Sequence, residues 1–115
     1  MSGSDRRALE SHLRVLLMHL LKWRYQPTGH RTGHSWADSI REARMQVADG
    51  LETHPGLHQH MPAIFGRAWR KARRDASRQT GLPVATFPEA CPWTVAQLLD
   101  NDFFPEPYEG HPGVR

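Results

Sequence analysis

The sequence has a single cysteine, Cys91, and contains no long hydrophobic run. One cysteine excludes an internal disulfide and any zinc site built from several cysteines. The longest apolar run near the N-terminus, residues 15–18, is ended by His19, whereas a membrane-spanning helix needs about 20 apolar residues. Asp5 and Glu10 occupy the region where a signal peptide is basic. We therefore expect no membrane segment, no signal peptide and a location in the reducing cytoplasm.

The sequence also lacks the short motifs that mark the commonest active sites. It has no glycine-rich phosphate loop, no nucleophile elbow and no paired-carboxylate motif. Strand patterns and internal repeats are absent as well. With 115 residues, of which 38% are apolar and 23% charged, the chain has the composition of one globular domain. We expect a single domain over residues 1–115, with its core at about 4–105, a flexible tail at 106–115 and no cofactor.

The N-terminal region predicts a long helix over residues 4–26, capped by Ser4 and ended by Pro27. Its main apolar stripe recurs at helical spacing and consists of Leu9, Leu13, Leu16, Leu17, Leu20 and Trp23. Three further apolar residues lie off this stripe, namely Val15, Met18 and Leu21. The helix is therefore apolar almost all round in its middle. Such a helix is normally central in its bundle or pairs with another subunit.

A second helix is expected after a glycine-containing loop at residues 28–34. Ser35 is expected to cap this helix, which should run to about Thr53, before a Pro-Gly pair. Its buried stripe is predicted to comprise Trp36, Ile40, Ala43, Val47 and Leu51.

A third helix is expected from Pro55, a residue that suits a first helical turn, to Gly81, which can supply a left-handed end. Its inner stripe is predicted to comprise Leu57, Met61, Ile64, Phe65, Ala68, Ala72 and Ala76. Pro62 conflicts with a continuous helix, because proline removes a hydrogen bond from a helix interior. We expect either a kink at Pro62 or two helical pieces that divide near His60.

Six of the nine prolines follow Gly81, and they favour extended or turn geometry there. One short helix fits this region, from Thr94 to about Asp100, because Thr94 and Gln97 form a capping box. Aromatic residues punctuate the same region: Phe87, Trp93, Phe103 and Phe104. The predicted fold is therefore all-α, an up-down bundle of three main helices with a short C-terminal helix and a proline- and aromatic-rich tail packed on it.

The formal net charge of +3 hides an asymmetry along the chain. Residues 1–80 carry 14 basic and 7 acidic side chains, whereas residues 81–115 carry 1 basic and 5 acidic ones. One face of the third helix collects cations at helical spacing: Arg67, Arg70, Lys71, Arg74 and Arg78. Such a stripe is typical of proteins that bind phosphate backbones. The alternative is a solvated face that pairs in part with the acidic tail, and no base-reading motif favours nucleic acid over this alternative.

The eight histidines and Cys91 are the residues that could act as metal ligands or nucleophilic catalysts. Two pairs are four residues apart, His30 with His34 and His54 with His58. Neither pair belongs to a recognised zinc motif or has a defined third ligand. A lone cysteine is usually a small buried hydrophobe. We assign no metal site and no catalytic residue.

A dense polar and aromatic group closes the first helix: His19, Lys22, Trp23 and Tyr25. These residues could line a pocket. The simpler interpretation, which we favour, is a buried His19 that bonds a backbone carbonyl, with Lys22 extending outward to water.

The run from Leu16 to Pro27 resembles the signature of an uncharacterised bacterial family, domain of unknown function twenty-nine. The resemblance continues over nearly the whole chain, through Ser35-Trp36, Ile40, Thr80-Gly81-Leu82, Phe87-Pro88, Cys91-Pro92 and Phe103-Phe104-Pro105. It implies a nearly all-helical domain, and it implies no activity, ligand or catalytic residue. Residues 69–78 are more basic than in the family pattern, so the resemblance assigns the basic face to this member. The cluster His19, Lys22, Trp23 and Tyr25 lies within the shared signature.

These observations favour a non-enzymatic protein that binds a protein partner or a second copy of itself. Binding of nucleic acid or another polyanion through the basic face is the alternative hypothesis, and no membrane partner is expected.

Overall fold

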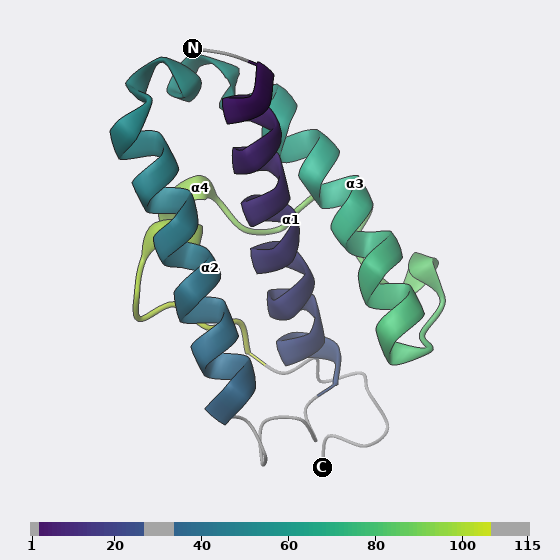
Figure 1. Cartoon of the computed structure of the whole chain (residues 1–115). Helices are drawn as coiled ribbons and strands as arrows, with labels where there is room; N and C mark the ends of the chain where they lie inside the picture. Colours follow the sequence, from purple (N-terminus) through teal and green to yellow (C-terminus); the bar gives the residue numbers. More distant parts are fainter. Residues whose placement is uncertain (1–2, 27–33, 107–115) are drawn as a thin grey trace.

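The computed structural model describes residues 3–26 and 34–106, with the backbone alone described at residues 34 and 35. The described part is all-helical and contains no strand. In chain order the elements are α1 (Gly3–Tyr25), α2 (His34–Thr53), the 3-10 helix η2 (Pro55–His60), α3 (Met61–Thr80), the 3-10 helix η3 (Val84–Thr86) and α4 (Val95–Leu99). The expected up-down bundle of three long helices is confirmed (Figure 1). No helix of the described part is long and apolar enough to cross a membrane.

Helix α1 is the central helix of this arrangement. It packs along both α2 and α3, which lie on either side of it (Figure 1). This position explains why α1 is apolar almost all round: Met18 and Leu21 are buried together with its main leucine stripe. Val15 is the exception, with 43% of its surface exposed. The helix begins at Gly3, so Ser4 lies within its first turn rather than at the expected cap.

Helix α2 buries four of the five predicted residues, Ile40, Ala43, Val47 and Leu51, whereas Trp36 is only partly buried. It begins at His34, one residue before the expected cap Ser35. The sequence 28–33 of the expected loop lies outside the described residues.

The expected division near His60 separates η2 from α3 and resolves the conflict at Pro62. Pro55 opens η2, and α3 begins at Met61 with Pro62 in its first turn. Proline is tolerated there because the N–H groups of a first helical turn have no acceptor within the helix, so the N–H that proline lacks costs no hydrogen bond. Gly81 ends α3 with a φ of 77°, the left-handed conformation expected of it.

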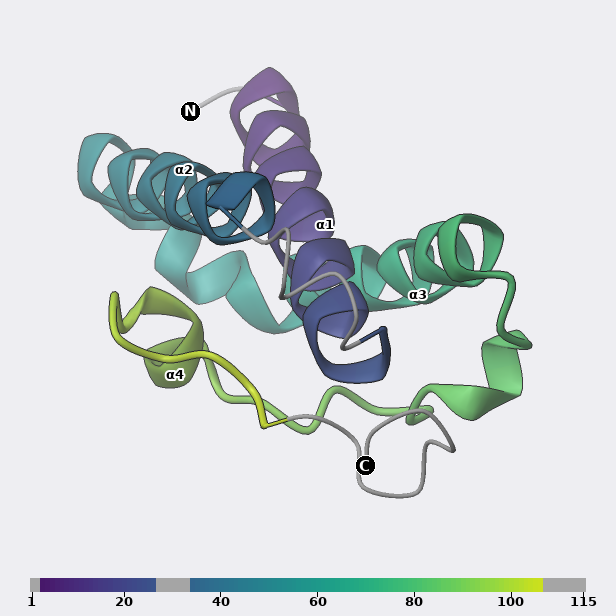
Figure 2. The same ribbon diagram turned by 90° about the horizontal axis from the view of Figure 1, so that it is seen from below.

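Residues 81–106 cross one side of the three long helices and carry α4 with them (Figure 2). Phe87 is buried edge-on against Tyr25, with ring centroids 5.1 Å apart. The indole nitrogen of Trp69 donates hydrogen bonds to backbone carbonyls in this segment, including that of Glu89 at 3.0 Å. The capping box of Thr94 and Gln97 is present at the start of α4, as predicted. The segment is therefore held by aromatic packing and by side chains that donate to its backbone.

Candidate interaction face

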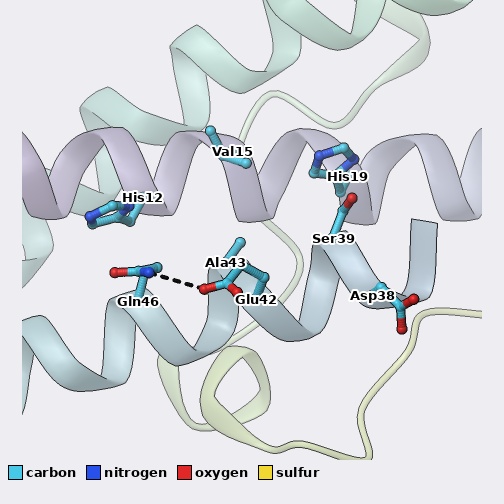
Figure 3. Close-up of a pocket in the computed structure, with 8 residues that line it drawn as sticks. All are labelled: His12, Val15, His19, Asp38, Ser39, Glu42, Ala43 and Gln46. Atoms are coloured by element: carbon cyan, nitrogen blue, oxygen red, sulfur yellow. Dashed lines mark hydrogen bonds between the residues drawn. The ribbon is translucent and has the colours of Figure 1, made fainter. Parts of the chain in front are cut away.

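A groove of about 440 Å³ lies between α1 and α2. From α1 it is lined by His12, Val15 and His19, which share one face because they are three or four residues apart. From α2 it is lined by Asp38, Ser39, Glu42, Ala43 and Gln46. Figure 3 shows Gln46 and Ser39 of α2 extending toward His12 and His19 of α1, whereas the carboxylate of Asp38 points away from α1. The amide of Gln46 donates to a carboxylate oxygen of Glu42 at 3.0 Å (Figure 3).

His19 is the most unusual group in this groove. Its Nδ1 atom is buried and makes no hydrogen bond, so the expected bond to a backbone carbonyl is wrong. Burial lowers the pKa of His19 below its usual value of 6.5, and the nearby positive charge of Lys22 lowers it further. The imidazole of His19 therefore remains neutral at neutral pH and adds no positive charge beside the side chains of Asp38 and Glu42.

The other three members of the predicted cluster serve different contacts. The ammonium of Lys22 donates to the side chain of Gln79 on α3 at 2.9 Å, and it lies 4.8 Å from the ring centroid of Trp36 on α2. The ring of Trp23 packs on Phe104 at 4.8 Å, and Tyr25 packs on Phe87. His19 alone lines the groove, so the structure does not bring the four residues into one site.

The basic face of α3 is partly neutralised by two carboxylates, one on α1 and one on α3 itself. Glu10 of α1 accepts hydrogen bonds from Arg67 at 2.7 Å and from Lys71. Burial of the Glu10 carboxylate opposes its ionisation, yet these two cations outweigh burial and lower its pKa. No described carboxylate beyond Gly81 forms an ion pair with α3.

Asp75 of α3 is the second carboxylate shared by two cations. Arg14 donates to both of its oxygens, at 2.5 and 2.8 Å, and Arg78 also donates to it. The hydrogen bond from Arg14 is the main reason that the pKa of Asp75 lies below its usual value. Asp75 and Glu10 were not predicted as partners of the basic face.

Two cations of the predicted face, Arg70 and Arg74, are exposed and make no ion pair or hydrogen bond with described residues. They line a hollow of about 420 Å³ on α3 together with Arg67, Lys71, Arg73 and Val84. The face thus carries more positive charge than its two carboxylates compensate.

The histidines and the cysteine do not form a further site in the part of the chain that the structure describes. His54 lies 3.4 Å from Asp5, and His60 lies 3.2 Å from Arg6. No three described side chains of His, Cys, Asp or Glu are grouped so that they could hold a metal ion. His30 lies outside the described residues, as does the side chain of His34. Burial raises the pKa of the Cys91 thiol to about 11, which disfavours the nucleophilic thiolate.

These features combine into one charge-polarised surface, which we call the open face and which is formed by side chains of α1, α2 and α3. Its middle strip on α1 consists of the exposed residues Ala8, Ser11 and Val15. Along α2 runs an acidic row of exposed side chains, Asp38, Glu42 and Asp49. Along α3 runs a basic row, Arg67, Lys71, Arg74 and Arg78.

Comparison with known families gives one match over residues 1–104, to the model of the family described as Domain of unknown function DUF29. No curated protein matches the chain. No solved structure matches it either.

Proposed function

Because the chain belongs to the family Domain of unknown function DUF29, whose description names no activity, we propose from its own residues that it is a non-enzymatic protein-interaction domain. The open face is its binding surface. The groove between α1 and α2 receives long basic side chains of the partner, and the fold serves as the rigid support. We place this function in the reducing cytoplasm, because a chain with one cysteine has no internal disulfide that an oxidising compartment would have to form.

The observation that carries this proposal is the chemistry of the groove lining. Val15 and Ala43 give the groove apolar surface, and Asp38 and Glu42 place carboxylates beside it. Lysine and arginine have apolar stems and charged ends, so they match a surface of this kind. The orphaned Nδ1 of His19 supports a binding role over a catalytic one, because a general base is normally oriented by a hydrogen-bonded partner.

A titration followed by NMR tests the proposal. The probe is a short amphipathic helical peptide with lysine and arginine on its polar side, and the control peptide carries glutamate at the same positions. We expect the basic peptide to shift the resonances of His12, Val15, His19 and Ala43, and the acidic peptide to leave them unchanged. Shifts spread evenly over the surface, or none at all, would contradict the proposal.

Variants of the groove sharpen this test. Asp38→Asn combined with Glu42→Gln should weaken binding of the basic peptide roughly two- to thirtyfold, since each of two exposed charge pairs contributes about 0.2–1 kcal/mol. Glu52→Gln is the matched control, because Glu52 is an exposed carboxylate of α2 outside the groove lining. Equal weakening by the two changes would point to a general charge effect.

A second candidate function is binding of nucleic acid or another polyanion through α3. It is favoured by Arg70 and Arg74, which have no carboxylate partner among described residues and line a hollow with three other cations. Phosphate backbones bind such clusters through counterion release, which makes the affinity strongly salt-dependent.

A mobility-shift titration across salt concentrations separates this candidate from the first. If polyanion binding is the function, Arg70→Glu with Arg74→Glu should abolish the shift and Arg7→Glu should not, because Arg7 is an exposed cation at the start of α1. The absence of a shift even at low salt would exclude it.

A further inference from the structure

The partner of the open face can be inferred from how the charges are arranged on it. This inference rests on the proposed interaction function and names the partner of the same surface. The basic row and Arg14 together carry five cations, and Glu10 and Asp75 compensate two of them. A net charge of +3 therefore lies beside α1 on one side. On the other side lie the three carboxylates of the acidic row, of which Asp38 pairs with Arg41 at 3.4 Å, so a net charge of −2 remains there.

The two rows are also matched in position along α1. Asp38 and Glu42 lie beside Val15 and His19, because they line one groove with them. On the other side of α1, Asp75 of α3 pairs with both Arg78 and Arg14. Because Arg14 belongs to α1, this shared pairing places Arg78 at the height of Arg14. The acidic and the basic groups are thus at similar heights on the two flanks of the middle of α1.

The same match holds nearer the N-terminus of α1. Asp49 lines a hollow together with Ala8 and His12, and Arg67 reaches Glu10 across the opposite flank. Each acidic group therefore has a basic group at a similar height on the other side of α1.

We infer that the partner is a second copy of this chain, bound by its own open face so that the acidic row of each copy lies on the basic row of the other. A two-fold axis that lies in the interface and runs along α1 produces this arrangement. An axis that crosses α1 at a right angle would place acidic on acidic and basic on basic, and like charges would repel. The charge pattern therefore specifies that the two α1 helices run parallel.

The middle strip fits this geometry. Ala8 and Ser11 are small and exposed, so two α1 helices can approach closely, and the exposed Val15 meets the Val15 of the second copy. On one flank, Arg74 and Arg78 extend toward the partner's groove, where Asp38 and Glu42 provide carboxylates. The surface is large enough: three helices of 20 to 23 residues form a face about 30 Å long and roughly 25 Å wide, near the roughly 800 Å² per partner of a standard interface.

Charge reversal followed by mixing tests the arrangement. One variant carries Asp38→Lys and Glu42→Lys, and the other carries Arg74→Glu and Arg78→Glu. We expect each variant alone to be monomeric at concentrations where the unmodified chain is dimeric, with dimerisation weakened at least tenfold. An equimolar mixture should form a heterodimer, because the two positively charged rows of one variant then lie on the two negatively charged rows of the other.

Circular dichroism of each variant shows whether its helices have formed. A heterodimer in the mixture also shows that both variants are folded, since mixing would not restore dimerisation to a misfolded chain. A mixture of two folded variants that stays monomeric would overturn the inference. So would two variants that each still dimerise alone.

The parallel direction of α1 is tested by cysteine cross-linking in a Cys91→Ser background. Ala8→Cys and Lys22→Cys should each form a disulfide with the same position of the second copy. A mixture that joins position 8 to position 22 instead would indicate antiparallel helices and overturn the inferred axis. A chain that stays monomeric while its groove still binds the basic peptide would overturn the second copy as partner and leave the proposed interaction function standing.

Discussion

The side chain of Arg44 on α2 is bound to the backbone of Leu98 on α4, with Nε donating to the Leu98 carbonyl at 2.5 Å. Its Nη2 donates to the Phe103 carbonyl at 2.8 Å. Arg44 is 1% exposed and has no ion pair among the described residues. Burial lowers its pKa, and the negative charge of Asp100 opposes this effect. One buried cation thus fixes both α4 and the chain that follows it.

We expect Arg44→Met to lower the free energy of unfolding by about 2–4 kcal/mol, because the buried carbonyl of Leu98 and the part-buried carbonyl of Phe103 lose their donor. Urea unfolding followed by circular dichroism measures the change. Arg41→Met is the control and should cost less than about 0.5 kcal/mol, since Arg41 is exposed. Equal effects of the two changes would show that the buried hydrogen bonds do not hold the segment.

Gly66 and Gly81 should respond in opposite directions to replacement by alanine. Gly66 lies inside α3, and an added Cβ would have Arg70 Nη1 as its nearest neighbour at 3.9 Å, so Gly66→Ala should stabilise the protein by about 0.5–1 kcal/mol. Gly81 has a φ of 77°, so Gly81→Ala should destabilise it by about 1 kcal/mol. Thermal unfolding of both variants provides the measurement, and a shift of the same sign in both would contradict the placement of the α3 end.

His19 should make the stability of the protein depend on pH below about 6.5. Its pKa is lowered in the folded state by burial and by Lys22, so the unfolded chain binds the proton more strongly. The contribution of neutral His19 to stability is therefore fully present above pH 6.5, and it is lost as the pH falls from 6.5 toward the lower pKa of the folded state.

The measurement is the free energy of unfolding of the unmodified chain and of His19→Leu between pH 7.5 and pH 5, a range of about two units around the usual histidine pKa. The variant should gain stability relative to the unmodified chain as the pH falls. His58→Leu controls for the loss of an exposed histidine. A constant difference between His19→Leu and the unmodified chain would show that His19 titrates as it does in the unfolded state.

Cys91 should be almost unreactive in the folded protein. Its thiol is partly buried, lies 3.5 Å from the Trp93 carbonyl and has a pKa raised to about 11. We expect a disulfide reagent to label the native protein at pH 8 at least about 100-fold more slowly than the urea-unfolded chain, since the thiolate is the reacting form. Comparable rates in the two states would contradict this and would restore Cys91 as a candidate nucleophile.

Most of the fold was predictable because it follows from local rules. The leucine spacing of α1, the left-handed Gly81 and the capping box at Thr94 depend on residues that are neighbours in sequence. The division between η2 and α3 near His60 followed from the helix hydrogen bond that Pro62 cannot make.

The candidate site was less predictable, because it depends on contacts between residues far apart in the chain. Arg44 stands one turn after Ile40 on the inner side of α2, but its partners are carbonyls more than 50 residues away. Glu10 and Asp75 pair with some of the cations of α3, and none of the described carboxylates beyond Gly81 does so, since α1 lies beside α3. Helical spacing within one segment predicted the basic row. The acidic row lies opposite the basic row only because α2 and α3 pack on opposite sides of α1, which the sequence pattern does not show.

Sedimentation equilibrium of the unmodified chain at low and high salt tests the central claim most directly. If the open face binds a second copy through opposite charges, the mass at low salt should approach twice the 13.2 kDa of the chain. It should fall toward 13.2 kDa as salt screens the two rows. A mass of 13.2 kDa at every concentration and salt level would contradict self-association through this face.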